Sequence, residues 1–241
     1  MDNSKKHNLI YINENRKDEP KEYFKFIVNY SNEYLKSIES PNVLDIGCAS
    51  GDFLFYIAQV HRHAKLTGLD ANNDMLEIAK NKVPDAEYIY GNIDKGTNLP
   101  KCEFDAIFMS GVNYIFDDYK PYIKNIIKLL KSTGRAYVFG SYNPEEVDVM
   151  AKIKRCGENY FEPGWNIFSI RTISDFLETL SVGYKFIEWN IHLDIQKNES
   201  DPLRSWTITK SNSEKIIVNG AQFINNFYLL TISKLVNTEY F

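Results

Sequence analysis

The chain has 241 residues and a formal charge of −4, from 28 basic and 32 acidic side chains. It contains no long Lys/Arg block, so its charge argues against a duplex or a tRNA as substrate, because such ligands need a basic surface. Its content of 44% hydrophobic and 25% charged residues is typical of a globular protein. We therefore expect a small molecule as the partner, and no nucleic acid.

Neither a membrane span nor an export signal is expected, because no stretch has the required apolar length. The three cysteines, Cys48, Cys102 and Cys156, are odd in number, widely spaced and without a C-x-x-C pair, so they indicate neither a disulfide framework nor a zinc site. Reduced thiols and a cytoplasmic location are therefore expected, with no metal. No Pro-, Gly- or Ser-rich linker divides the chain, which favours a single domain over residues 1–241. The oligomeric state cannot be predicted.

The N-terminal part, residues 1–37, is expected to carry a helix over 20–36, with Pro20 in the first turn, where its missing N–H does no harm. Tyr11, Tyr23 and Phe24 are candidates to line a lid over a ligand. Aromatic residues on an amphipathic helix more often pack into a core, and that alternative stays open.

An apolar strand over 43–46 is followed by a turn of small residues from Gly47 to Gly51 and then by a helix over about 50–63. Such a turn lets backbone N–H groups approach a polar ligand, and the helix N-terminus favours an anionic group there. A phosphate-binding P-loop would need a lysine after Gly51, and a dinucleotide site would need G-x-G-x-x-G spacing. The sequence has neither.

The segment Leu44-Asp45-Ile46-Gly47-Cys48-Ala49-Ser50-Gly51 resembles the first motif of the class I S-adenosylmethionine-dependent methyltransferases. The match extends over about residues 40–140. A second strand, 65–69, ends at Asp70 after a helical crossover, which is the distance that a β-α-β unit requires. The resemblance implies that the Asp70 carboxylate accepts hydrogen bonds from the ribose hydroxyls of the cofactor.

The resemblance also implies the fold class: α/β, with a Rossmann-like, seven-stranded, mainly parallel sheet, helices on both faces and an antiparallel last strand. Strands over 86–90, 104–109 and 135–140, with a helix over 119–131 between the last two, fit this order. Residues 38–140 then form the cofactor-binding half and 141–241 the acceptor-binding half. The expected contacts of S-adenosylmethionine, and of the product S-adenosylhomocysteine, are Asp45, Gly47, Cys48, Ala49, Gly51, Asp70, Ala71, Gly91, Asn92, Ile93 and Ser110.

At Asn92 many relatives have an aspartate that binds the adenine amino group, and the amide oxygen of Asn92 can accept the same bond more weakly. Asp94 is a rival for that role. Asp45 is expected to hold the turn or to approach the methionine amino group. Cys48 is expected to be a small packed residue, because no histidine or lysine is placed to lower its pKa.

Two long connections are expected to wall the acceptor pocket, because they leave the carboxyl ends of strands. The first, 141–171, precedes a helix over 173–180 capped by Thr172 or Ser174. The second, 192–222, lies between strands 184–191 and 223–233 and reads as an added β-hairpin over 205–218. The expected acceptor-binding residues are Asn113, Tyr142, Trp165, Arg204 and Trp206.

His192, with Asp194 two residues on, is the candidate general base, against the alternative of a structural or exposed histidine. The expected reaction is methyl transfer to a small polar acceptor, an oxygen atom above all, in a bacterial surface-polysaccharide or specialised-metabolite pathway. The segment Ser110-Gly111-Val112-Asn113-Tyr114 lacks the Asn-Pro-Pro-Tyr type of motif, which disfavours base and amide nitrogens. Two alternatives remain: a small-molecule N-methyltransferase, and a catalytically silent S-adenosylmethionine-binding partner subunit.

Overall fold

A computed structural model describes residues 19–162, 165–190, 193–199, 201 and 203–234. Its centre is a seven-stranded sheet with the order β3-β2-β1-β4-β5-β9-β6. Strands β1 to β5 pair in parallel, and β9 runs antiparallel to both β5 and β6. The strands are β1 (Asn42–Ile46), β2 (Lys65–Asp70), β3 (Glu87–Tyr90), β4 (Phe104–Ser110), β5 (Leu130–Ser141), β6 (Val182–Glu188) and β9 (Phe227–Lys234). The Rossmann-like fold predicted from the sequence, with its antiparallel last strand, is confirmed.

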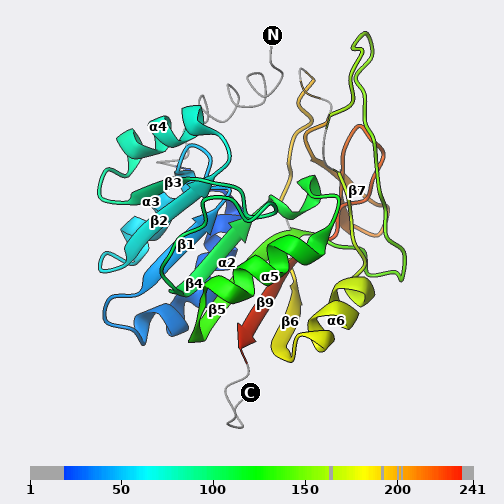
Figure 1. The fold of residues 1–241 in the computed structure, drawn as a ribbon. Coiled ribbons are helices and arrows are strands. Elements are labelled where there is room, and N and C mark those ends of the chain that lie inside the picture. The colour runs from blue at the N-terminus through cyan, green and yellow to red at the C-terminus, as the bar shows by residue number, and fades with distance from the viewer. Residues whose placement is uncertain (1–18, 163–164, 191–192, 200, 202, 235–241) are drawn as a thin grey trace.

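Helices cover both faces of this sheet, and Figure 1 shows α5 and α6 in front of it and α2 behind it. The helices are α2 (Glu22–Lys36), α3 (Asp52–Val60), α4 (Asn73–Lys82), the short 3-10 helix η1 (Asn113–Ile115), α5 (Tyr119–Leu129) and α6 (Ile170–Thr179). One buried cluster joins the sheet to α5 and α6, and a second joins it to α2, α3 and α4. Central strands are therefore apolar on both sides, as parallel strands between two helical layers must be.

Several element boundaries differ from those predicted. Helix α6 begins at Ile170, and its N-cap is Ser169, whose Oγ accepts from the Thr172 N–H at 2.9 Å; the predicted caps at Thr172 and Ser174 are wrong. Strand β9 begins at Phe227 rather than at residue 223, because the Asn225 N–H bonds to the Ile217 carbonyl at 2.8 Å instead of joining the sheet. Both shifts come from tertiary contacts that a local pattern does not contain.

Helix α2 packs into the core behind the sheet. The Tyr23 ring stacks on Phe139 with centroids 5.0 Å apart, and Phe24 is 5% exposed against Phe53. These two aromatic residues therefore follow the packing alternative. Tyr11 lies outside the described residues, so the N-terminal lid stays a prediction.

The predicted hairpin exists as a separate two-stranded antiparallel sheet of β7 (Trp206–Thr209) and β8 (Lys215–Val218). Figure 1 shows it above β6 and β9, toward the end of the sheet at which the parallel strands finish. Among the described helices, none is long and apolar enough to cross a membrane.

Candidate active site

The turn after β1 has an unusual backbone conformation. Gly47, Ala49 and Gly51 all have positive φ, at 71°, 45° and 77°. A Cβ atom on Gly47 would lie 2.6 Å from Val112 Cγ2, and one on Gly51 would lie 3.0 Å from the Ala79 Cβ. Glycine is therefore needed at both positions for two reasons: the backbone has a positive φ, and a neighbouring side chain leaves no room for a Cβ atom.

This turn leads into α3, whose N-cap Gly51 offers no side-chain cap. The first N–H groups of a helix have no partner within the helix, so here they face the space above the turn. The Gly47 and Cys48 N–H groups instead bond back to the Leu69 carbonyl of β2, at 2.7 and 3.2 Å. The turn is thus fixed to the neighbouring strand while the helix end stays available to a polar ligand.

Asp70 ends β2 beside this turn, as the sequence predicted. Its Oδ2 accepts from the Ala49 N–H and its Oδ1 from the Asn72 N–H, each at 2.8 Å. Burial raises the pKa of this carboxyl, and the bonds from Ala49, Asn72 and Ala71 oppose that shift. Each carboxylate oxygen keeps a second lone pair, so Asp70 can brace the turn and still accept from a pair of hydroxyls.

Asp45 and Cys48 lie below the turn. Asp45 is 2% exposed, and its Oδ2 is buried with no hydrogen-bond partner among the described residues. Burial, and then the nearby Asp70, raise its pKa well above the ordinary value. Burial likewise raises the pKa of the Cys48 thiol, whose Sγ would lie 2.7 Å from a Cβ on Gly68. Cys48 is therefore a packed residue and not a nucleophile.

The segment after β3 forms a tight loop at the same edge. Asn92 and Thr97 exchange backbone hydrogen bonds of 3.0 and 3.2 Å, and the Asn92 Oδ1 accepts from the Lys95 N–H at 2.8 Å. One lone pair of the oxygen expected to bind adenine is thus already used. The pKa of Asp94 is raised, first by burial and then by Asp118.

Three more buried polar atoms where β4 and β5 end have no hydrogen-bond partner among the described residues. They are Ser110 Oγ, Asn113 Oδ1 and Ser141 Oγ. The Asn113 side chain lies over Gly140, where a Cβ would approach its Oδ1 to 1.8 Å, and its Nδ2 donates to the Ser141 carbonyl at 3.3 Å. Unpaired buried polar groups cost free energy, so native proteins keep them mainly where a ligand or water satisfies them.

The first rim connection folds onto the β4–α5 connection. The Trp165 ring stacks on Tyr114 with centroids 5.6 Å apart, and the Asn166 N–H donates to the Tyr114 carbonyl at 3.0 Å. Asn166 Nδ2 also donates to the Phe116 carbonyl at 3.0 Å. Sequence reasoning singled out Trp165 but missed Tyr114 and Asn166, since no local pattern signals this contact across about fifty residues.

Arg204 and Trp206 belong to a different part of the rim. The Arg204 Nε lies 3.7 Å from the buried Asp201 carboxylate, and the Lys197 Nζ lies 5.6 Å from the Trp206 ring centroid. Arg155 bonds the same Asp201 at 2.8 Å, which ties the two long connections together. His192, the predicted general base, lies outside the described residues, so its role stays a prediction.

Residues 43–134 match the methyltransferase domain family. Over these residues the chain carries a methyltransferase domain similar to those of S-adenosylmethionine-dependent methyltransferases. It is similar to a demethylmenaquinone methyltransferase of Thermotoga maritima, with 31% identity over 105 residues, or 43% of this chain and 44% of that protein. The chain spans less than half the length of the curated relatives it matches.

Two solved structures share the fold of the methyltransferase domain. One is an S-adenosylmethionine-dependent methyltransferase from Clostridium acetobutylicum, with a TM-score of 0.58 and 13% identity over 93% of this chain and 94% of that one. The other is the DhpI–SAH complex, with a TM-score of 0.53 and 15% identity over 90% of this chain and 92% of that one. At such identities the likeness shows the fold and not the acceptor.

The residues of the methyltransferase domain fit the cofactor. A purine nucleoside with a charged amino-acid tail needs a close backbone approach, an acceptor for two hydroxyls and an acceptor for an ammonium group. The turn from Gly47 to Gly51, the Asp70 carboxylate and the buried, unpaired Asp45 carboxylate offer these three features at one edge of the sheet. No group of three or more His, Cys, Asp or Glu among the described residues is arranged to hold a metal ion.

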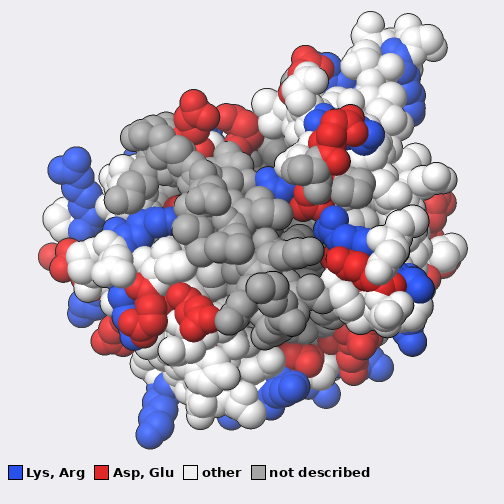
Figure 2. Space-filling view, turned by 90° about the horizontal axis from the view of Figure 1, so that it is seen from above, with Lys and Arg blue, Asp and Glu red and all other residues white. Residues whose placement is uncertain are grey.

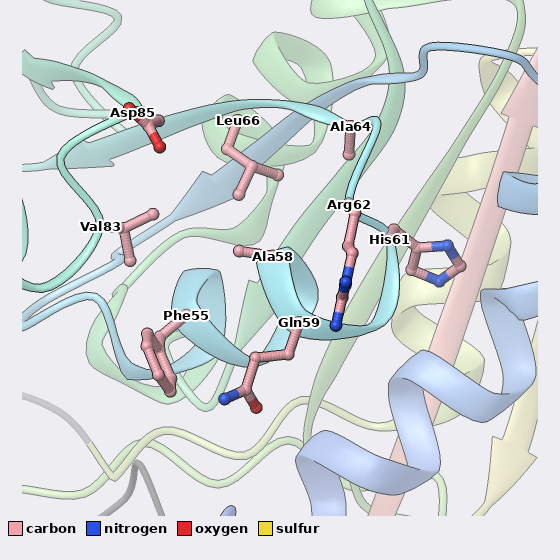
Figure 3. A pocket seen from close by; sticks show the side chains of 9 residues that line it. All are labelled: Phe55, Ala58, Gln59, His61, Arg62, Ala64, Leu66, Val83 and Asp85. Carbon is pink, nitrogen blue, oxygen red and sulfur yellow. The ribbon is translucent and has the colours of Figure 1, made fainter.

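The hollow in Figure 3 is a different feature of the methyltransferase domain. It has a volume of about 390 Å³ and lies between the end of α3 and the start of β2, so it is at the opposite edge of the sheet from Asp70. Figure 3 shows the His61 ring turned away from Phe55 and Val83 across the hollow. Figure 2, which looks onto the edge carrying the glycine turn, shows acidic and basic side chains interspersed over the described surface.

Proposed function

We propose that this protein transfers the methyl group of S-adenosylmethionine to a small polar acceptor, with an oxygen atom as the nucleophile. The observation that carries the proposal is the glycine turn braced by Asp70 through the 2.8 Å bond from the Ala49 N–H. That arrangement places backbone donors and a buried carboxylate side by side where parallel strands end, which is where such folds bind their ligands. The methyl donor carries an activated methyl group on its sulfonium, so the chain itself must mainly align, exclude water and accept a proton.

Three groups would hold the cofactor. Asp70 would accept from the ribose hydroxyls, and Asp45 would accept from the methionine ammonium group. Ala71, Gly91, Asn92 and Ile93 would border the adenine, with the second lone pair of the Asn92 oxygen facing its amino group. The high pKa of buried Asp45 fits this role, since an incoming positive charge would stabilise its ionised form.

The acceptor would lie beyond Ser110, over the ends of β4 and β5. The Asn113 Oδ1, which has no hydrogen-bond partner among the described residues, would supply an acceptor for a polar group there, and the buried Tyr142 beside it would support the Asn113 side chain. Trp165, stacked on Tyr114, would form one wall, and Arg204 and Trp206 would lie farther out on the rim. On the described surface around this edge, acidic and basic side chains are interspersed, which supports a small acceptor rather than a nucleic acid.

His192 is the proposed general base, because in the sequence it follows β6 at the start of the second rim connection, with Asp194 two residues on. In the alternative of a small-molecule N-methyltransferase, a general base would be less necessary. In the alternative of a silent cofactor-binding subunit, no general base would be necessary. The surface-polysaccharide or specialised-metabolite pathway and the cytoplasmic location are likewise proposals. The proposed cytoplasmic location rests on the three cysteines, which are free in the described structure.

Calorimetry with S-adenosylhomocysteine tests the cofactor site. We expect Asp70→Ala to weaken binding by at least about tenfold, since it removes a buried acceptor and the brace of the turn. Asp85→Ala, an exposed position at the opposite edge, is the matched control and should bind as the wild type does. Absence of any binding to the wild type would rule out both methyl transfer and a silent cofactor-binding role.

A search for the acceptor follows from the first result. Cell extract, sugar nucleotides and phosphorylated metabolites would be incubated with S-adenosylmethionine and screened by mass spectrometry for the gain of one methyl group. His192→Ala should keep cofactor affinity and lose turnover. Full turnover in that variant would remove His192 from the mechanism, and cofactor binding without any product would favour the silent subunit.

A further inference from the structure

A second cavity lies between the β7–β8 hairpin and the sheet. Its volume is about 480 Å³, within the roughly 300–1,000 Å³ of pockets that take small molecules. It is lined by the end of β6 and the two residues after it, by the start of β9 and the residues before it, and by β8 with the turn that precedes it. Since β9 is antiparallel, its start lies at the edge of the sheet that also carries the glycine turn.

Backbone hydrogen bonds hold the walls of this cavity together. The Trp189 N–H donates to the Phe227 carbonyl at 2.9 Å, and the Asn225 N–H donates to the Ile217 carbonyl at 2.8 Å. The hairpin is also tied to the connection after β6, because the Lys215 Nζ bonds the Asp194 carboxylate at 2.8 Å. A cavity with such walls is already formed before a ligand arrives, so little ordering entropy opposes binding.

The cavity combines an aromatic side with planar polar groups. Trp189 and Phe227 line it, and Trp189 is itself held by Tyr23 and Phe26 of α2. Asn225 lines it too, is 8% exposed, and has a buried Nδ2 with no partner among the described residues. An unpaired amide donor against a cavity is a group that a ligand oxygen would satisfy.

The charges around the cavity disfavour an anion. Its lining contains one cation, Lys215, which already pairs with Asp194, and two carboxylates, Glu188 and Glu214. The pKa of Glu214 is lowered by hydrogen bonds from Lys210 and Asn212, so this carboxylate is ionised at neutral pH. A phosphate or carboxylate ligand would therefore meet a net negative surface.

We propose that this cavity binds a neutral polyhydroxylated ligand, a mono- or disaccharide. The C–H face of a sugar ring packs on Trp189 or Phe227, and pairs of neighbouring hydroxyls match the two oxygens of Glu188 and the amides of Asn190 and Asn225. This proposal rests on the proposed function in one respect: the bound sugar is then part of the methyl acceptor. Binding itself requires neither cofactor nor methyl transfer.

The test is a titration of the full chain with methyl glycosides of glucose, galactose, mannose and N-acetylglucosamine, without cofactor. Tryptophan fluorescence of the unaltered chain follows the titration, because Trp189 lines the cavity. We expect a saturable change with at least one glycoside. Glu188→Gln and Asn190→Ala should each raise Kd by about tenfold, or about 1.4 kcal/mol. Both are exposed, so neither should prevent folding.

Matched controls are Glu87→Gln and Asn81→Ala, exposed positions on β3 and α4, which should change Kd by less than about twofold. The proposal is overturned if no glycoside gives a saturable change up to roughly 100 mM, a level that detects even very weak sites. It is also overturned if the cavity variants bind as well as the controls, or if glucose 6-phosphate binds more tightly than glucose. Calorimetry with S-adenosylhomocysteine on the same samples shows separately whether the cofactor site works.

Discussion

Replacing Gly47 by alanine tests whether the turn after β1 is fixed by the backbone alone or also by its neighbour. Gly47 has φ 71°, and a Cβ there would lie 2.6 Å from Val112 Cγ2 and 3.2 Å from Cγ1. Gly157 has a similar φ of 82°, and a Cβ there would meet nothing within 4 Å. Gly157→Ala is therefore a control that carries the backbone cost without the contact.

The two contributions have different sizes. A left-handed conformation costs an alanine about 1–2 kcal/mol, which is the whole expected effect of Gly157→Ala. Overpacking against Val112 adds about 1–3 kcal/mol, so Gly47→Ala should lower the free energy of unfolding by about 2–5 kcal/mol. For a chain of this size each kcal/mol lowers Tm by roughly 2–4 °C. Val112→Ala removes both Cγ atoms, so the double variant Gly47→Ala/Val112→Ala should recover the overpacking contribution.

Urea unfolding of the wild type, the single variants and the double variant measures these contributions. The double-mutant cycle should give a favourable coupling of about 1–3 kcal/mol between positions 47 and 112, because each alanine relieves what the other has introduced. Equal destabilisation by Gly47→Ala and Gly157→Ala would refute the reasoning. So would a coupling near zero, since Val112 would then not be the group that keeps Gly47 free of a side chain.

Three further predictions concern other described residues. Burial raises the pKa of Asp45 in the folded chain, so above the ordinary carboxyl pKa this side chain is ionised in the unfolded chain and still protonated in the folded one. Ionisation favours the unfolded chain, so the free energy of unfolding falls as pH rises through this range. Asp45→Asn should therefore raise the free energy of unfolding more at pH 7 than at pH 4, while it weakens binding of S-adenosylhomocysteine; equal gains at both pH values would contradict this. Asp201→Ala should cost about 1–3 kcal/mol, because it removes the bond from Arg155 that joins the two rim connections while Arg155 keeps its bond to Glu162, whereas Glu199→Ala on the exposed surface should cost little. Ser169→Ala should destabilise by about 1 kcal/mol through loss of the α6 cap, and Ser174→Ala in the same helix should not; thermal unfolding of both variants decides it.

The sequence predicted the strands, helices and turns of residues 38–140 well, because their signals are local. Each strand is a short apolar run, each turn is marked by small residues, and Asp70 stands one β-α-β unit after the glycine turn. The structure adds that Ala49 has φ 45° and that its N–H bonds Asp70, so the carboxylate also braces the turn. The local sequence pattern does not indicate whether the Asp70 carboxylate bonds the turn in this way or is free of it.

Residues 141–234 were predicted less completely, because their contacts join positions that are far apart in the chain. Asn166 bonds the carbonyls of Tyr114 and Phe116, and Arg155 bonds Asp201, each across more than forty positions. The burial of Asn113 over Gly140 likewise depends on two strand ends meeting in register.

What the sequence determined by itself is therefore the succession of strands and helices up to β5 and the glycine turn from Gly47 to Gly51, since these follow from periodicity and from turn residues within a few positions of each other. Only the tertiary structure decided how the rim is assembled. It brought Trp165 onto Tyr114, drew Asn225 away from β9 toward Ile217, and left a cavity beside Trp189. The physical reason is that hydrogen bonds between residues far apart in the chain depend on which loops come together when the core packs. A short stretch of sequence does not contain that information.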